Sequence, residues 1–228
     1  GNFHEKTAGV YEDLSLLTAH SDLTKEVAKI FDFFESSFER KQYKLLFVSP
    51  FTNRRRFMNL INEEMKRAKA GKEAWIRLKL NNLVDTGMID KLYRASAAGV
   101  RVQLVVRGIC ALKAGWPGLS DNIEVRSVVG RYLEHSRFAV FAGGGDTQVY
   151  LSSADWMTRN LDRRVEVTTP VLDPGLKAQL VDLFDHLWRD NQKARRVTGN
   201  GDNLPAGEVG SEPFLAQERL YAYHANQG

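Results

Sequence analysis

The chain has 228 residues, with 32 Lys and Arg against 28 Asp and Glu, so its net charge of +4 favours anionic partners only mildly. The basic residues are scattered among acidic ones, which does not predict nucleic-acid binding, and one cysteine, Cys110, excludes an intrachain disulfide and a thiolate zinc site. Because no apolar run reaches the roughly 18 residues of a membrane span and no signal peptide is visible, we expect a cytoplasmic protein, or one peripheral to the membrane.

The first part of the chain predicts an alternation of helices and strands. Residues 1–22 carry no convincing periodic element and fit the end of a preceding domain; without an initiator Met, the chain resembles a piece of a longer protein. Hydrophobic periodicity predicts a helix from Leu23 to about Ser36. Further patterns predict strands over 44–50, 75–81 and 100–107, with helices over 57–68 and from Asp85 or Thr86 to Gly99.

This β-α-β-α-β order predicts a parallel sheet with right-handed crossovers and helices on both faces. Ligands of such sheets gather at the carboxyl ends of the strands. Polar residues at the predicted strand ends, which we therefore expect to border one crevice, are Ser49, Lys79, Asn81, Asn82, Arg107 and Gly108.

The last part of the chain predicts a strand over 165–171 and a helix from Pro174 to Trp188 with a regular apolar stripe. Residues 191–212 are rich in Gly, Asn and charge, and indicate a linker or a long surface connection before a terminal helix near 214–221. We expect three parts: 1–22 as the end of a preceding catalytic domain, 23–196 as the main domain, and 197–228 as a linker with a possible terminal helix.

Polar groups that a core does not need are concentrated between Tyr132 and Arg164. A strand starting near His135 would place His135 and Arg137 on one face, and the turn AGGGD would lead into the partner strand QVYLSS. The end of that strand and the residues after it supply Ser152, Ser153, Asp155, Arg159, Asn160, Arg163 and Arg164. Imidazole, guanidinium, hydroxyl and carboxamide groups together suit phosphoryl transfer or polyanion binding, although His135 and Arg137 alone would more often be a surface pair.

Several chemistries lack the residues they need. The motifs GxGxxG after a strand, GxxxxGK[ST] and GxSxG do not occur, which argues against a dinucleotide fold, a P-loop and an α/β-hydrolase. The five histidines are far apart in sequence, so no protein-only metal cage is predicted. Magnesium could still arrive with phosphate groups, which supply most of its ligands.

A series of sequence blocks resembles a known family. The blocks are GNFHEKTA, YEDLSLLTA, VSPF, LKLNNLVD, VVRGIC, RYLEHSR and YLSSADWMTRNLDRRVEV, followed by LDP. In this order, from Gly1 to about Arg196, they resemble the C-terminal half of the ATP-dependent polyphosphate kinases. The resemblance implies an α/β fold, a phospholipase-D-like mixed sheet flanked by helices. It also implies reversible transfer of the γ-phosphoryl group of ATP to polyphosphate through a phosphohistidine, with Mg²⁺ bound to ATP.

The resemblance assigns roles to individual residues. Tyr11, Arg107 and His135 match the family's nucleotide-contacting tyrosine, arginine and second histidine, so we expect all three to bind ATP and His135 to be catalytic. Weaker candidates for phosphate contacts, chosen by location, are Lys79, Arg137, Arg159, Arg163 and Arg164. The family's phosphorylated histidine and magnesium-binding arginines lie upstream of the GNF block and are not in this chain. We therefore expect the chain alone to lack a complete kinase site and any metal ligand.

The expected partners are ATP or ADP and inorganic polyphosphate, without nucleic acid, and a homo-oligomer in the full-length protein. Two other functions remain open. A phospholipase-D-type phosphodiesterase would need two histidine-containing halves, of which His135, Arg137, Ser153 and Asn160 form at most one. A polyanion-binding module without catalysis would need only the basic crevice.

Overall fold

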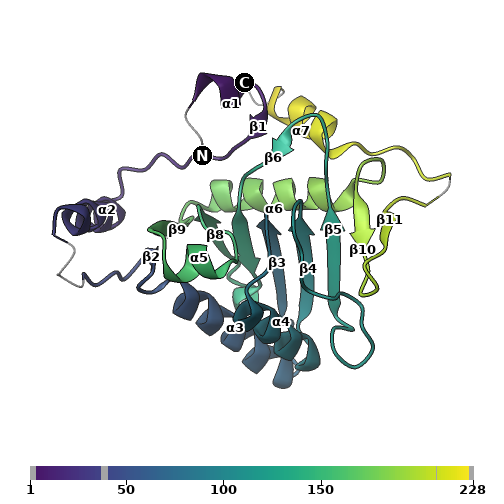
Figure 1. Cartoon of the computed structure of the whole chain (residues 1–228), viewed down its shortest axis with the longest axis horizontal. Coiled ribbons are helices and arrows are strands. Elements are labelled where there is room, and N and C mark those ends of the chain that lie inside the picture. Colours follow the sequence, from purple (N-terminus) through teal and green to yellow (C-terminus); the bar gives the residue numbers. More distant parts are fainter. Residues whose placement is uncertain (1–3, 37–40, 209, 226–228) are drawn as a thin grey trace.

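The computed structural model describes residues 4–36, 41–208 and 210–225, and a nine-stranded mixed sheet forms its centre (Figure 1). The strand order is β11-β10-β5-β4-β3-β7-β8-β9-β2. The parallel centre consists of β3 (Trp75–Leu80), β4 (Arg101–Val106) and β5 (Ile123–Ser127). The antiparallel strands are β2 (Phe47–Ser49), β7 (Phe138–Phe141), β8 (Gln148–Ser152), β9 (Glu166–Pro170), β10 (Arg195–Val197) and β11 (Asn203–Pro205).

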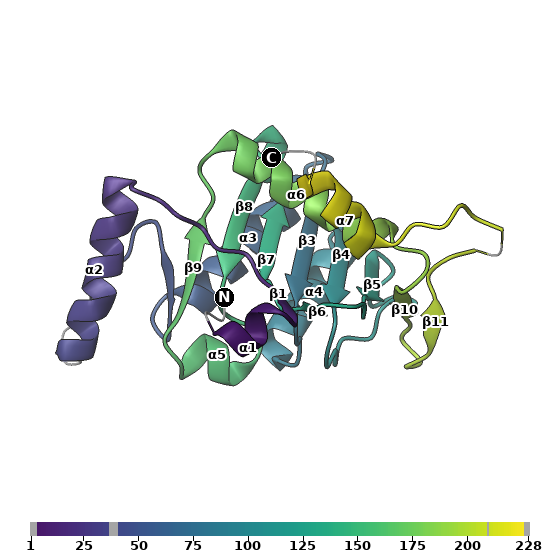
Figure 2. The same ribbon diagram turned by 90° about the horizontal axis from the view of Figure 1, so that it is seen from above.

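Helices cover both faces of the sheet, which confirms the expected mixed sheet flanked by helices (Figures 1 and 2). On one face, α3 (Asn53–Lys69) and α4 (Thr86–Ala97) pack on alternate residues of β3 and β4 such as Leu78 and Leu104. On the other, α6 (Pro174–Arg189) and α7 (Ala216–Ala225) pack on Val105, Phe138 and Val140. Because successive side chains of a strand point to opposite faces, β3 and β4 contribute to both cores.

Two expectations about the sheet are wrong in detail. The strand near residue 47 does not pair in parallel with β3; β2 lies at the far edge and pairs antiparallel with β9. An apolar run reports burial, and it does not identify the neighbouring strand. The stretch 191–212, expected to be a linker or a long surface connection, contains the antiparallel strands β10 and β11 at the opposite edge. These strands have three residues each, too few for a visible alternation.

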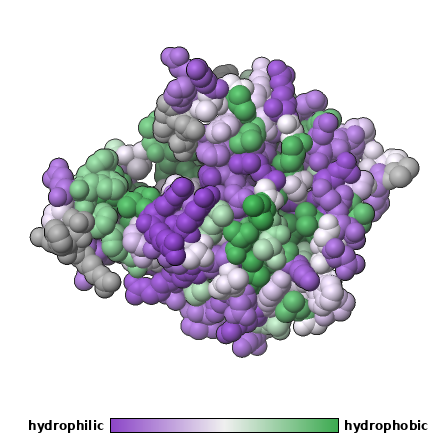
Figure 3. All heavy atoms as spheres, in the orientation of Figure 1, coloured by the Kyte–Doolittle hydropathy of each residue, from purple (hydrophilic) through white to green (hydrophobic). Residues whose placement is uncertain are grey.

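Helix α2 (Ser21–Glu35) matches the predicted helix but lies outside the two layers (Figures 1 and 2). Leu23 and Ile30 pack against Tyr43 and Leu46 in a small core of their own. Phe31 and Phe34 are 64% and 62% exposed, and Figure 3 shows hydrophobic side chains over this helix. Within the described ranges, no helix is long and apolar enough to cross a bilayer.

Short elements bring the N-terminal segment to one end of the large sheet. Strand β1 (Tyr11–Glu12), which follows α1 (Glu5–Ala8), pairs in parallel with β6 (Leu133–Glu134). Helix α5 (Thr158–Asp162) follows β8. The predicted turn is a 3₁₀ turn at Gly143–Gly145, in which all three glycines have positive φ, a conformation that costs glycine little.

Candidate functional site

The pairing of β1 with β6 places Tyr11 beside His135. The backbone amide of His135 donates a hydrogen bond to the carbonyl of Glu12 (3.1 Å), and the Leu133 amide donates to the carbonyl of Val10 (2.8 Å). The rings of Tyr11 and His135 lie with their centroids 4.8 Å apart and their planes inclined by 37°. Two of the three predicted nucleotide-binding residues are therefore in direct contact.

The imidazole of His135 is oriented by a carboxylate. Its Nδ1 lies 2.7 Å from Oδ1 of Asp13, and both side chains are about one-fifth exposed. Because an ionised carboxylate can only accept, Nδ1 carries the proton and Nε2 is the nitrogen left for a ligand. His135 and Asp13 line a cavity of about 480 Å³ together with Arg137, Ser153 and Arg164. His135 does not belong to a strand of the large sheet, since residues 135–137 connect β6 to β7, which begins at Phe138.

Lys79, which contacts the cavity residue Ser136, forms a buried ionic cluster. Its Nζ contacts Ser136 Oγ (2.7 Å), the Ser136 carbonyl (2.9 Å), Glu134 Oε2 (3.1 Å) and Glu12 Oε2 (3.2 Å). Burial alone would raise the pKa of Glu12, but the Lys79 charge and hydrogen bonds from Ser136 outweigh it and lower that pKa. Lys79 is 1% exposed. Its ammonium is therefore occupied by protein groups, and this geometry favours a structural role over a phosphate contact.

Arg107 lies at the end of β4 and is linked to His135 through Asn81. The Arg107 Nε donates to the Glu134 carbonyl (2.6 Å) and to Asn81 Oδ1 (3.1 Å), while Asn81 Nδ2 donates to the His135 carbonyl (3.3 Å). The terminal amino groups of Arg107 have no hydrogen bond within the described ranges and can clamp phosphate oxygens. The following Gly108 is required for close packing, since a Cβ there would lie 2.7 Å from the Asn81 carbonyl oxygen. Asn81, Asn82, Arg107 and Gly108 meet as predicted, whereas Ser49 is buried in β2 at the edge of the sheet.

Asp155 holds the strand ends together and fixes Arg137. It accepts from the backbone amides of Asn81 (2.8 Å) and Asn82 (3.0 Å) and from Arg137 Nε (3.1 Å). Burial would raise its pKa, but Arg137 and Asn82 outweigh that effect and lower it. Arg137 also donates to the His135 carbonyl (2.9 Å), so its guanidinium supports the loop that carries His135.

The remaining predicted residues surround α5. Arg159, Arg163 and Arg164 are exposed, and of these only Arg164 lines the cavity. Ser153 Oγ and Asn160 Nδ2 both donate to the carboxylate of Glu166. Asp162 forms a salt bridge with Arg54 of α3.

Sequence reasoning missed four residues that orient the predicted ones: Glu12, Asp13, Glu134 and Gln217. The first two adjoin Tyr11 in the block YEDL, which was the available signal. Gln217 comes from α7: its Oε1 accepts from the Tyr132 amide (3.0 Å), and its Nε2 donates to the Tyr132 carbonyl and to Glu134 Oε1 (2.8 Å each). The amide thus joins the last helix to the strand that precedes His135.

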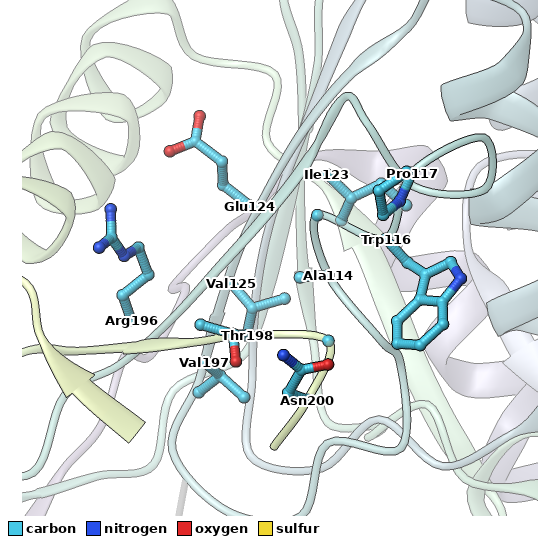
Figure 4. A pocket seen from close by; sticks show the side chains of 12 residues that line it. Ala114, Trp116, Pro117, Ile123, Glu124, Val125, Arg196, Val197, Thr198 and Asn200 are labelled. Carbon is cyan, nitrogen blue, oxygen red and sulfur yellow. The ribbon is translucent and has the colours of Figure 1, made fainter. Parts of the chain in front are cut away.

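Another cavity lies at the β5–β10 edge of the sheet and contains none of the predicted site residues (Figure 4). Figure 4 shows Trp116 on one side of it and Glu124 and Arg196 on the other, with Val125 and Val197 between them. This cavity lacks a histidine, so it does not compete with the His135 cavity as a phosphoryl-transfer site.

The donor set does not fit a resident metal ion. In the part of the chain that the structure describes, no group of three or more His, Cys, Asp or Glu side chains could hold one. The carboxylates near His135 are instead engaged by Lys79, Arg137 and His135 itself.

Two family models cover almost the whole chain. Residues 1–41 match "Polyphosphate kinase C-terminal domain 1", and residues 46–217 match "Polyphosphate kinase C-terminal domain 2". The chain belongs to the polyphosphate kinase family. The predicted division at residues 22 and 196 differs from these limits and remains a prediction, because neither match tests where independently folding units begin.

Polyphosphate kinases from several bacteria are similar to this chain. The Salmonella typhimurium and Escherichia coli K12 enzymes are 48% and 47% identical over 98% of it, and the Klebsiella pneumoniae enzyme is 50% identical over 98%. The crystal structure of polyphosphate kinase from Porphyromonas gingivalis matches all of the chain with a TM-score of 0.95 at 40% identity. The chain spans about a third of these relatives: 32–33% of the three sequences and 35% of the solved structure.

Proposed function

We propose that the chain is the nucleotide-binding and phosphate-binding part of a polyphosphate kinase, which transfers the γ-phosphoryl group of ATP reversibly to polyphosphate. The observation that carries this proposal is the position of His135, which contacts both the Tyr11 ring and the Asp13 carboxylate. The preceding residue, Glu134, accepts a hydrogen bond from Arg107 through its carbonyl. An aromatic ring, a clamping guanidinium and an oriented imidazole are the groups needed to hold a nucleotide triphosphate and stabilise a transferring phosphoryl group.

Each residue has a separate task in this proposal. Tyr11 stacks on or hydrogen-bonds the nucleotide, and Arg107 binds phosphate oxygens through its terminal amino groups. The Nε2 atom of His135 accepts a proton when the imidazole is neutral and donates a hydrogen bond to a phosphoryl oxygen when it is protonated. Asp13 stabilises the positive charge of the protonated ring, as a carboxylate does in acid–base triads. Among the weaker candidates, Arg164 is the best placed for a polyphosphate contact, because it is exposed and lines the cavity.

The phosphorylated histidine of the proposed mechanism is the upstream residue that the family resemblance implies. Magnesium would enter with ATP, whose phosphate oxygens supply most of its ligands, because the described residues offer no cage for it. We therefore propose that the chain alone binds nucleotide or polyphosphate without synthesising the polymer. A cytoplasmic location and a homo-oligomeric full-length enzyme complete the proposal.

Titration calorimetry with a non-hydrolysable ATP analogue and magnesium tests the nucleotide site. We expect His135→Ala and Arg107→Ala to weaken binding about tenfold or more, since each removes a hydrogen bond to a charged group. Arg101→Ala is the matched control, because Arg101 is exposed and does not line the cavity. Binding that none of the three changes affects would contradict the assigned site.

Two activity assays test the alternatives. Cleavage of a phosphodiester by the chain would favour the phosphodiesterase, and ATP-dependent polymer synthesis by the chain alone would contradict the upstream nucleophile.

A further inference from the structure

A second basic cavity, of about 490 Å³, lies where the C-terminal end of α6 meets the segment leading into α7. Its lining includes three guanidinium groups, two aromatic rings and one carboxylate: Arg126, Arg189, Arg219, Trp188, Phe214 and Glu212. We refer to it as the arginine pocket. It shares no lining residue with the His135 cavity, and its volume is within the range of ordinary ligand sites.

Aromatic rings hold the three guanidinium groups in place. The guanidinium carbons of Arg126 and Arg189 lie 4.5 Å from the ring centroids of Trp188 and Phe214, and that of Arg219 lies 5.7 Å from the Phe214 centroid. A guanidinium stacked on a ring keeps the N–H groups at its edge available for an oxyanion. The stacking itself uses none of their N–H donors, of which one, on Arg126, is bound to the Trp188 carbonyl.

The positive charge of the arginine pocket is not balanced by ion pairs. Within the described ranges, Arg126, Arg189 and Arg219 form no salt bridge, and a hydrogen bond from Arg126 goes to the neutral Trp188 carbonyl. The carboxylate of the nearby Asp190 is occupied by backbone amides, including those of Lys193 and Ala216. Glu212 is the one carboxylate in the lining.

The adjoining strand pair adds a further unbalanced charge. Arg126 of β5 lies directly opposite Arg196 of β10 in the antiparallel register, an arrangement that costs stability when both residues carry the same charge. Glu124, two residues from Arg126 on the same face of β5, compensates only part of this positive charge. Figure 4 shows Glu124 and Arg196 on the same side of the neighbouring cavity. A bound anion would relieve this repulsion.

We propose that the arginine pocket binds phosphate groups of inorganic polyphosphate, as an accessory site separate from the His135 cavity. The choice of polymer rests on the proposed function. A polyphosphate chain presents oxyanions in succession, so one ligand can neutralise several guanidinium groups at once. Holding the polymer at a second point raises its effective concentration at the His135 cavity.

Titration calorimetry of the chain with long-chain inorganic polyphosphate tests this site, with an ATP analogue and inorganic phosphate titrated in parallel. The test variant is Arg189→Gln/Arg219→Gln, because both side chains are exposed and can change without disturbing the core. The control Arg55→Gln/Arg101→Gln removes two exposed arginines elsewhere and so changes the net charge equally. Circular dichroism and thermal unfolding confirm that both variants fold.

We expect the test variant to bind polyphosphate about tenfold or more weakly than the control, with a shallower salt dependence and unchanged affinity for the ATP analogue. Equal polyphosphate affinity in the two variants would overturn the proposal, as would a wild-type chain that does not bind polyphosphate. A loss of ATP-analogue affinity equal to that for polyphosphate would also overturn it. If the wild-type chain binds polyphosphate but no ATP analogue, and the test variant still loses affinity, the arginine pocket stands and the nucleotide site fails.

Discussion

The carboxylate of Asp13 lies 2.7 Å from Nδ1 of His135, although 121 residues separate the two positions in the chain. The contact depends on the pairing of β1 with β6, which carries the N-terminal segment to the end of the large sheet. One imidazole nitrogen is thereby committed to Asp13, and His135 lines the cavity. Asp13 acts on a ligand through His135, so it is a positioning residue.

Replacing Asp13 with Asn should disturb the tautomer of His135 while preserving the shape of the side chain. We expect the nitrogen NMR signals of the His135 ring to shift, because an amide can also donate and no longer selects the Nδ1–H form. Affinity for the ATP analogue should fall about threefold to tenfold, less than for His135→Ala. Asp173→Asn, a change of an exposed helix cap on α6, is the control and should leave both measurements unaltered. Unchanged ring signals in Asp13→Asn would contradict the orienting role.

Lys79→Met tests whether the buried lysine is structural. The change leaves the carboxylates of Glu12 and Glu134 without their shared cation, which should lower the free energy of unfolding by about 3–5 kcal/mol. Urea denaturation measures this loss, and Lys72→Met, at an exposed position, should cost little. If the variant is as stable as the control and instead loses polyphosphate affinity, Lys79 is a phosphate contact, as the sequence first indicated.

Periodicity predicted the central elements well because burial and the apolar pattern have the same cause. Helices α3, α4 and α6 each present an apolar face to one of the cores, and strands β3 and β4 contribute side chains to both. The same signal says nothing about which strands pair, so the edge position of β2 could not be predicted. Strands β10 and β11 were missed because three-residue edge strands need little apolar surface.

The site residues, like the strands, were only partly predictable from the sequence. Tyr11, Arg107 and His135 could be named because they stand in recognisable sequence blocks, and the structure links them through β1, β6 and Asn81. The roles of Asp13 and Gln217 could not be predicted, since they arise from contacts between segments far apart in the chain. Lys79 was named for its place at a strand end, but a strand position does not reveal that two carboxylates surround the ammonium.

Asp85 should make the chain less stable in acid. It accepts hydrogen bonds from Arg54 (2.6 Å), Thr158 and the Met88 amide; burial would raise its pKa, but these partners outweigh it and lower the pKa to about 2. A carboxyl with a depressed pKa stabilises the fold above its ordinary pKa of 3.8, and this contribution is lost as the pH falls towards 2. We expect a loss of about 2 kcal/mol over that range.

Urea denaturation between pH 5 and pH 2 measures the effect, at pH values about one unit apart. The buffers are chosen so that the wild-type transition stays reversible. Asp85→Asn keeps an oxygen to cap α4 but cannot ionise, so its stability should fall less steeply with acid than that of the wild type. Asp90→Asn, an exposed change on the same helix, should follow the wild-type curve. Parallel curves for wild type and Asp85→Asn would show that other carboxyls cause the loss.

Gln217 should matter for nucleotide binding although it lies outside the cavity. Its amide makes three hydrogen bonds to Tyr132 and Glu134, and the Glu134 carbonyl in turn accepts from Arg107. Gln217→Ala removes these bonds and should lower stability by about 1–3 kcal/mol. It should also weaken binding of the ATP analogue, because β6 is no longer fixed next to His135.

A general loss of stability in Gln217→Ala must be distinguished from a displacement of β6 and His135. Gln217→Glu keeps the length of the side chain but places a carboxylate against Glu134 and cannot donate to the Tyr132 carbonyl, so we expect it to bind the analogue more weakly than Gln217→Ala. Gln179→Ala, an exposed change on α6, is the control. Nitrogen NMR of the His135 ring, recorded where each variant is fully folded, supplies the deciding measurement. If the ring signals and the affinity match the wild type while only the stability falls, α7 merely packs on the core, and the site does not depend on it.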